Sequence, residues 1–269
     1  MPYSTAEIRN VCLVGPSHAG KTLLTEALLH AGGKIPEKGS IEKGTTVSDF
    51  TNREKEIGHS QSNSVCHLDH EGIHVNLIDT PGYRDFYGRA LSVMPAAETA
   101  AVVINATQGV EEMARRMMRA AHDQRMCRMI IVNKIDAEGV NLEKVFNDIQ
   151  EAFGKECLPM NLPSADGSKV VDCFFQLEGD ETAFSSVAEA HTQVVDQVVE
   201  VDEDDQADDL ADRPQPEQDQ GLLDRGDLLR GRVEGRVHVP QQLVGEGDVL
   251  ADELLDLLDL DLGVEQPRE

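Results

Sequence analysis

The sequence predicts an α/β protein in which helices cover both faces of a mostly parallel sheet, giving a three-layer fold. Two observations support this fold class. Short apolar runs of strand length alternate with segments of helical periodicity from residue 1 to about residue 150. These runs are typical of strands covered on both faces. Hydrophobic residues make up 40% of the chain, which is enough for a buried core.

Seven elements are expected in order: a strand, a helix, a long loop, a hairpin, a buried strand, a helix and a second buried strand. They are assigned to residues 11–14, 23–28, 34–62, 65–78, 101–104, 111–123 and 129–132. The helices show apolar residues at helical spacing. The loop is polar and rich in Gly, Ser and Thr, and the hairpin turns at Gly72.

The chain divides into three parts by composition. Residues 1–155 form the α/β domain, and residues 156–200 form a partial insertion subdomain in which residues 169–175 read as a strand. Residues 201–269 are acidic and are expected to be disordered or irregular. The formal net charge is −26, and residues 200–269 contribute −16 of it. Such a charge argues against broad binding to DNA or other nucleic acid.

The C-terminal segment has an unusual amino-acid composition. From Gln193 to Glu269 only ten residue types occur, and all ten have codons that can begin with G or C. We hypothesise that the coding sequence leaves its reading frame, or crosses into antisense DNA, near residue 200. The alternative is a genuine acidic tail. Resequencing the gene decides between them, because an error-free, in-frame continuation into the same tail rules out the frame hypothesis.

The cysteines and the apolar runs indicate the compartment. The five cysteines are scattered without a C-x-x-C pair, as expected of free thiols in a reducing cytosol. The N-terminus lacks a signal-peptide pattern, and no apolar run reaches membrane-spanning length. We therefore expect a soluble, cytoplasmic protein that does not interact with membranes.

A phosphate-binding motif lies between the first strand and the first helix. It matches G-x-x-x-x-G-K-[ST] and consists of Gly15, Pro16, Ser17, His18, Ala19, Gly20, Lys21 and Thr22. Backbone N–H groups and the helix N-terminus would hold phosphates. Lys21 would reach the β- and γ-phosphates and assist catalysis, and the Thr22 hydroxyl would bind Mg²⁺. The alternative is a chance glycine-rich turn.

Two further motifs follow later strands. Asp79, Thr80, Pro81 and Gly82 come after residues 75–78, where Asp79 could hold Mg²⁺ and the Gly82 N–H could contact the γ-phosphate. Asn133, Lys134, Ile135 and Asp136 come after residues 129–132. The Asp136 carboxylate suits the two adjacent donors of guanine, whereas adenine has an acceptor at N1, so this motif selects GTP and GDP over ATP. Alone, it could be a polar helix start with Asp136 as the cap.

With these motifs, residues 1 to about 200 resemble the GTP-binding domain of translational GTPases of the elongation factor G group, especially its elongation-factor-G-like branch. The resemblance also rests on residues 44–50, 53–56, 85–86 and 158–163. It implies a P-loop GTPase that uses Mg²⁺ and acts on the ribosome. It implies Ser60 in place of the threonine that closes on Mg²⁺ and the γ-phosphate. It also implies Tyr83 in place of the histidine that orients the attacking water.

A third departure concerns the last strand. The family's Ser-Ala motif, which contacts guanine after the last strand, has no credible copy here, since Ser164 and Ala165 lie in a Pro-rich loop. The later domains of the family are also absent from the sequence. We therefore expect the sheet to lack its last strand and helix. Two hypotheses remain: a GTP hydrolase, or a truncated nucleotide-binding fragment with little turnover and no translocase activity.

Two other groups of residues have alternative interpretations. Cys66, His67, His70 and His74 could hold zinc, but their spacing is not a zinc pattern, and surface strand residues explain them better. Arg115, Arg116 and Arg119 could contact ribosomal RNA or form the solvated face of a helix, which we favour.

Overall fold

The computed structural model describes residues 3–165, 170–176, 179, 182–197 and 241–244. Seven strands form the main sheet in the order β2-β3-β1-β4-β5-β9-β6, and two more form a small second sheet, β7-β8. Only β2 is antiparallel to its neighbour in the main sheet, so the sheet is mostly parallel, as predicted. The strands are β1 Ile8–Val14, β2 Ser64–His70, β3 Ile73–Asp79, β4 Thr99–Asn105, β5 Cys127–Asn133, β6 Leu158–Pro159, β7 Asn161–Pro163, β8 Val170–Asp172 and β9 Gln241–Val244.

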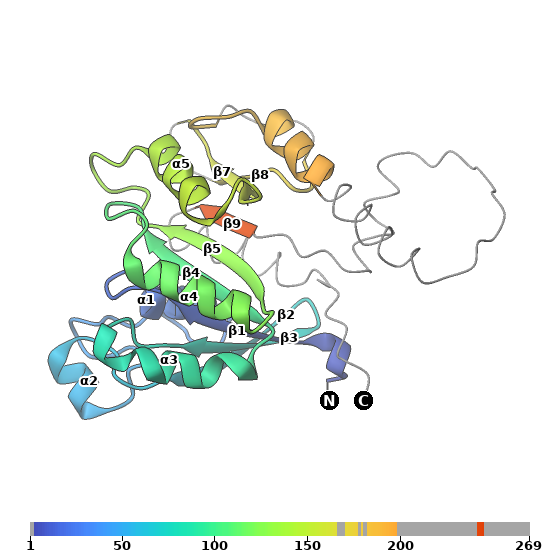
Figure 1. Ribbon diagram of the computed structural model, residues 1–269. Helices are drawn as coiled ribbons and strands as arrows, with labels where there is room; N and C mark the ends of the chain where they lie inside the picture. The colour runs from blue at the N-terminus through green and yellow to red at the C-terminus, as the bar shows by residue number, and fades with distance from the viewer. Residues whose placement is uncertain (1–2, 166–169, 177–178, 180–181, 198–240, 245–269) are drawn as a thin grey trace.

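Helices cover both faces of this sheet (Figure 1). The helices are α1 Lys21–Ala31, α2 Asn52–Ile57, α3 Tyr87–Val93, α4 Glu112–Asp123 and α5 Leu142–Phe153, with a further helix over residues 187–197. Short 3-10 turns are Thr5–Glu7, Arg84–Phe86 and Met94–Ala96. None of the helices in the described part of the chain has the length and apolar character needed to cross a lipid bilayer.

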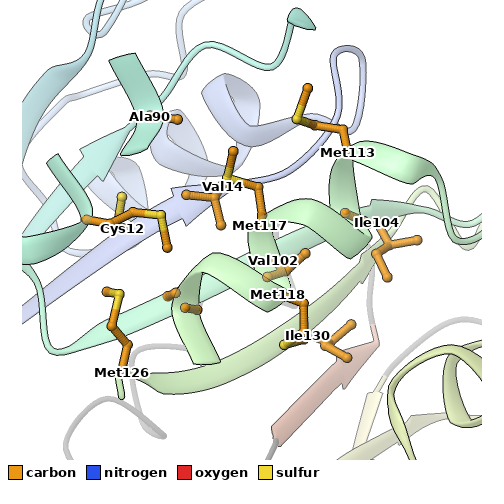
Figure 2. Close-up of a cluster of buried hydrophobic side chains, with 14 of the residues drawn as sticks. Cys12, Val14, Ala90, Val102, Ile104, Met113, Met117, Met118, Met126 and Ile130 are labelled. Carbon is orange, nitrogen blue, oxygen red and sulfur yellow. The ribbon is translucent and has the colours of Figure 1, made fainter. Parts of the chain in front are cut away.

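The strands divide two cores between their faces. Successive side chains of a strand point to opposite sides, so Val11 and Leu13 of β1 pack with the helix α1, whereas Cys12 and Val14 pack with α3 and α4. Figure 2 shows the second core, in which methionines of α4 lie against the strands. β4 is buried along its whole length, which explains why its sequence is apolar without alternation.

The loop predicted over residues 34–62 contains a helix, α2, so that expectation is wrong in this part. The helix is stabilised by a capping box, in which the Thr51 hydroxyl accepts from the Glu54 N–H and the Glu54 carboxylate accepts from the Thr51 N–H. Its sequence, Asn-Arg-Glu-Lys-Glu-Ile, is almost entirely polar. Apolar periodicity therefore could not indicate the helix, although the spacing of Thr51 and Glu54 could.

The expectation that the sheet lacks its last strand is also wrong. Gln241–Val244 forms β9, which lies parallel to β5 on one side and to β6 on the other. Backbone pairing with two neighbours can hold a segment whose own composition does not predict a strand. The expected loss of the following helix, and the rest of the predicted disordered tail over residues 201–269, lie outside the described residues.

Residues 156–197 include a small unit with its own sheet. β7 and β8 pair antiparallel, and the predicted strand over 169–175 corresponds to β8. Leu162 and Val171 of this sheet share a core with Cys173, Val187 and Ala190, two of which belong to the helix over 187–197. In Figure 1 this unit lies at the β9 end of the main sheet, away from α2 and α3.

Candidate functional site

Three loops meet at one edge of the main sheet, where parallel strands end. Residues 15–20 follow β1, residues 80–83 follow β3 and residues 134–136 follow β5. A pocket at this edge is lined by residues of all three loops together with Ile41, Asp49 and residues 58–60 of the long loop. Ligands of open α/β sheets bind at this kind of edge.

The loop after β1 holds a buried lysine. Lys21 is 6% exposed and opens α1, and its Nζ donates to the carbonyls of Gly15 at 3.1 Å and Pro16 at 2.7 Å. Burial lowers the pKa of Lys21 to about 8, and the negative charges of Asp79 and Glu111 oppose that shift. The ammonium is thus held inside the loop, in a position where it could contact a bound polyphosphate.

The loop after β3 crosses directly over the first loop. A Cβ on Gly82 would lie 2.5 Å from Lys21 Nζ and 2.5 Å from the Ser17 nitrogen, so a side chain does not fit there. Thr80 fastens the crossing, because its hydroxyl donates to the Leu13 carbonyl at 2.7 Å. Pro81, between them, is buried. This close approach leaves the backbone of Gly82 facing the phosphate loop.

The three residues predicted to bind metal lie together. The Thr22 hydroxyl donates to Asp79 Oδ2 at 2.8 Å and lies 3.1 Å from the Ser60 Oγ. The Ser60 hydroxyl donates to Asp49 Oδ1 at 2.7 Å. Each hydroxyl carries a single proton, and both are used by carboxylates. The contact between Thr22 and Ser60 is therefore one between oxygens with no proton left to share.

Asp79 contributes a further oxygen acceptor that has no hydrogen-bond donor within the described part of the chain. It is 2% exposed, and its Oδ1 makes no hydrogen bond among the described residues. Burial raises the pKa of Asp79 to about 6, although Lys21 and the Thr22 hydroxyl lower it in part. Mg²⁺ prefers hard oxygen ligands of this type. Thr22, Ser60 and Asp79 therefore fit a magnesium ion, with Asp49 beside them.

Two buried carboxylates hold the long loop in the position that brings Ser60 to Thr22. Glu26 of α1 accepts from the Gly39 N–H at 2.8 Å and the Val47 N–H at 2.5 Å. Glu54 accepts from the N–H groups of Gln61 at 2.9 Å and Ser62 at 2.8 Å. Burial raises the pKa of Glu54, but its hydrogen bonds outweigh this and hold the pKa below its usual value.

Tyr83 lies between two histidines, and all three residues line the pocket. Its hydroxyl is 3.0 Å from His18 Nε2, and its ring centroid is 4.4 Å from that of His59. The His18 ring meets the Tyr83 ring edge-on, with centroids 5.7 Å apart. Neither Asp49 nor the His18 and His59 contacts were anticipated from the sequence, since isolated residues in loops carry no spacing signal.

The motif after β5 is bound to the first loop. Asn133 Nδ2 donates to the Ala19 carbonyl at 3.0 Å, and Asn133 Oδ1 accepts from the Lys134 N–H at 2.8 Å. Lys134 Nζ donates to the His18 carbonyl at 2.8 Å. Ile135 packs against the core beside α4, and Asp136 is exposed. The carboxylate is thus accessible while the residues before it are anchored.

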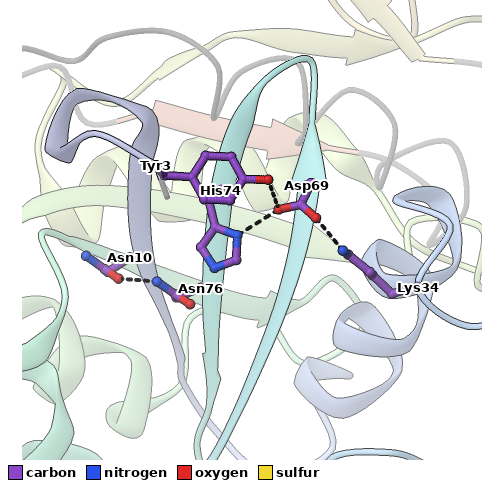
Figure 3. Close-up of polar contacts among 6 residues, drawn as sticks. All are labelled: Tyr3, Asn10, Lys34, Asp69, His74 and Asn76. Atoms are coloured by element: carbon purple, nitrogen blue, oxygen red, sulfur yellow. Dashed lines mark hydrogen bonds and ion pairs between the residues drawn. The ribbon is translucent and has the colours of Figure 1, made fainter. Parts of the chain in front are cut away.

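The alternative zinc site is not observed. Within the described residues, no group of three or more His, Cys, Asp or Glu side chains is arranged to hold a metal. Instead, His74 Nδ1 pairs with Asp69 Oδ1 at 2.7 Å, and Asp69 also contacts Lys34 and the Tyr3 hydroxyl (Figure 3). Cys66 is buried in the α1 core.

The arginines of α4 fit the solvated-face interpretation in part. Arg116 Nε pairs with Glu112 Oε1 at 3.0 Å, four residues away, and both side chains are about half exposed. The five cysteines are free thiols, in agreement with the sequence expectation.

The chain is similar to proteins of known family. A family model described as the elongation factor Tu GTP binding domain matches residues 6–234. The chain is 42% identical over 160 residues to the elongation factor G-like protein of Mycobacterium tuberculosis, in an alignment covering 60% of the chain and 22% of that protein. It is 32% identical over 152 residues to the tetracycline resistance protein TetO of Streptococcus mutans, covering 56% of the chain and 24% of TetO.

A solved structure agrees with these sequence matches. The crystal structure of a protein from Thermus thermophilus superposes with a TM-score of 0.77 at 28% identity, covering 95% of this chain and 40% of that protein. The chain matches less than a quarter of the length of the two curated relatives.

Proposed function

Because the chain belongs to the elongation factor Tu GTP binding domain family, among the elongation-factor-G-like translational GTPases, we propose that it binds GTP with Mg²⁺ and hydrolyses it to GDP and phosphate. The observation that carries this proposal is the meeting of Thr22, Ser60 and Asp79 beside the buried Lys21. These four residues come from three segments, since Lys21 and Thr22 are adjacent at the start of α1. Together they match the needs of a magnesium–triphosphate complex.

The loop from Gly15 to Thr22 would hold the phosphates. Its backbone N–H groups and the N-terminus of α1 provide a positive potential at the place where the phosphates would bind. Lys21 would exchange its contacts with the Gly15 and Pro16 carbonyls for the β- and γ-phosphates. The Gly82 N–H, kept close to Lys21 by the lack of a side chain, would donate to the γ-phosphate.

Thr22, Ser60 and Asp79 would hold Mg²⁺, directly or through water. The ion, when bound, offsets the negative charge that develops between the β- and γ-phosphates. The protein residues then keep fixed positions around it, since Glu54 holds the loop that carries Ser60.

The Asp136 carboxylate would select guanine by accepting from its two adjacent N–H groups. Asn133 and Lys134 would keep this carboxylate in register with the phosphate loop through their bonds to Ala19 and His18. Adenine would leave the carboxylate without a donor at N1, so ATP should bind poorly.

In the reaction, a water oxygen forms a bond to the γ-phosphorus. The bond from that phosphorus to the bridging oxygen breaks, its electron pair leaves on GDP, and a water proton passes to the released phosphate. Lys21 would stabilise the transferring group. Tyr83 would orient the water, in place of the histidine that the family resemblance implies.

The division of the chain supports a wider proposal. Residues 1–155 would form the nucleotide-binding domain, residues 156–200 an insertion subdomain with its own core, and residues 201–269 a separate acidic segment. We place the activity in the cytoplasm and take the ribosome as partner, because the relatives include an elongation factor G-like protein. The second candidate function is nucleotide binding without turnover.

Nucleotide-dependent stabilisation tests the binding proposal. GDP or GTP with Mg²⁺ at about a hundredfold above Kd should stabilise the chain by about 2.7 kcal/mol, whereas ATP should not. Failure to bind labelled GTP would exclude both candidate functions. Phosphate release measured with and without ribosomes then separates them, because ribosome-stimulated hydrolysis contradicts the fragment interpretation.

A further inference from the structure

The side chain of His18 has no assigned task in the phosphate-binding motif. That motif works through backbone N–H groups, the lysine and the hydroxyl, and its intermediate positions accept any residue. Yet His18 has a φ of 61°, a left-handed conformation that is uncommon for a residue with a side chain. Its imidazole lines the pocket and lies 3.0 Å from the Tyr83 hydroxyl.

The Tyr83 side chain is held from two directions. The His18 ring approaches its hydroxyl, and the His59 ring packs against its ring at 4.4 Å between centroids. Tyr83 is anchored one residue after Gly82, whose backbone contacts the phosphate loop. Tyr83 and His18 both line the pocket that the γ-phosphate would enter.

We propose that His18 is a positioning residue for hydrolysis, whose Nε2 accepts a hydrogen bond from the Tyr83 hydroxyl and so leaves the lone pairs of the phenolic oxygen for the attacking water. This inference rests on the proposed GTPase function. A free tyrosine hydroxyl is a rotor that can donate or accept. Once its proton is engaged by Nε2 of a neutral imidazole, only lone pairs remain, and the water donates to them. The water oxygen then keeps a lone pair for the γ-phosphorus.

This arrangement divides one task between two residues. A histidine in place of Tyr83 could accept directly from water through a ring nitrogen. A tyrosine cannot do so in one fixed orientation unless a second group holds its proton. In this chain that group comes from the phosphate loop itself, so the positions of the water-orienting oxygen and the phosphates are linked through one short segment.

The test compares two amides at position 18. His18→Gln places an amide near the position of Nε2, whereas His18→Asn is one methylene shorter and does not reach Tyr83, although asparagine tolerates the left-handed conformation better. Single-turnover GTP hydrolysis at saturating GTP and Mg²⁺ is measured for the full wild-type chain and for four variants. These are His18→Gln, His18→Asn, Tyr83→Phe and the double variant His18→Asn/Tyr83→Phe. GDP affinity is measured in parallel with a fluorescent nucleotide.

We expect His18→Asn and Tyr83→Phe each to slow hydrolysis by at least about tenfold with unchanged GDP affinity. His18→Gln should stay close to the wild-type rate, and the double variant should be no slower than Tyr83→Phe. A wild-type rate for His18→Asn, or independent effects that multiply in the double variant, would overturn the inference. A wild-type chain that does not bind GTP, or that binds GTP without hydrolysing it, would instead overturn the proposed function, and the inference with it.

Discussion

The side-chain amide of Asn133 donates to the main-chain carbonyl of Ala19 over 3.0 Å, so the end of β5 is tied to the loop that precedes α1. The next residue, Gly20, has a φ of 97°, and a Cβ there would lie 2.3 Å from Asn133 Nδ2. The hydrogen bond between Asn133 and Ala19 therefore depends on the lack of a side chain at Gly20.

Gly20→Ala should break this tie. The methyl group would push the Asn133 amide away from Ala19, and the left-handed backbone adds strain of about 1 kcal/mol. We expect the affinity for GDP to fall at least tenfold, as about 1.4 kcal/mol of binding free energy is lost. Isothermal titration of GDP and thermal unfolding measure the two effects.

Gly72→Ala is the matched control. Its φ of 95° is nearly that of Gly20, but it lies in the β2–β3 turn with nothing within 4 Å of a new Cβ. It should lose a similar stability of about 1 kcal/mol from backbone strain and keep its affinity for GDP. Equal losses of GDP affinity in the two variants would show that the contact with Asn133 has no part in binding.

Thr22→Val tests the magnesium site. Valine has the shape of threonine without the hydroxyl, so the contacts of Thr22 with Asp79 and Ser60 are lost. The increase in GDP affinity that Mg²⁺ produces should shrink by about ten- to a hundredfold, while affinity in EDTA changes little. Thr22→Ser keeps the hydroxyl and should retain most of the Mg²⁺ effect. An Mg²⁺ effect of wild-type size in Thr22→Val would argue against this site.

Asp136→Asn should change base preference. The carboxylate accepts twice, whereas an amide accepts once and donates once. GTP binding should fall by about a hundredfold or more, because the amide N–H of the new asparagine would face the N2 amino group of guanine, and both are hydrogen-bond donors. Xanthine presents a carbonyl at that position, so xanthosine triphosphate should bind better than it does to the wild type. Competition binding measures both, and Glu138→Gln, an exposed change in the same loop, should alter neither.

Much of the sheet could be predicted because its physical signal is local. β4 and β5 lie inside the sheet, so their sequences are apolar over several residues, and the β2–β3 hairpin has Gly72 at its turn. The three motifs could also be placed at one edge, since parallel strands end on the same side. α2 escaped prediction because its six residues are held by caps and not by an apolar face.

The part of the site formed by the long loop could not be predicted from residue patterns. Glu26 and Glu54 set the path of this loop through hydrogen bonds to backbone N–H groups 7 to 21 residues further along the chain. Such contacts have no period in the sequence. Ser60 is predictable only through the family resemblance. No sequence pattern points to its neighbour Asp49, whose carboxylate accepts a hydrogen bond from the Ser60 hydroxyl at 2.7 Å.

Asp69, at the other end of β2 and β3 from the nucleotide site, should make the stability of the fold depend on acid pH. Its carboxylate accepts from Lys34, His74 and the Tyr3 hydroxyl (Figure 3), and these contacts hold its pKa well below the usual value. A carboxylate whose pKa is lower in the folded state stabilises the fold above its unfolded pKa of about 4, and this contribution is lost as the pH falls toward the folded pKa. Asp69→Asn should therefore be less stable than the wild type at neutral pH.

The difference should be modest, at most about 1 kcal/mol, because the cluster is partly exposed and screened by solvent. Urea unfolding at pH 7, 5 and 3 measures it, and the gap between Asp69→Asn and the wild type should narrow between pH 5 and 3. Glu151→Gln, which removes another exposed carboxylate on α5, should show a smaller gap at neutral pH. If the stability difference between Asp69→Asn and the wild type instead grows as the pH falls, the expected pH dependence is reversed. The ionised carboxylate of Asp69 would then destabilise the cluster.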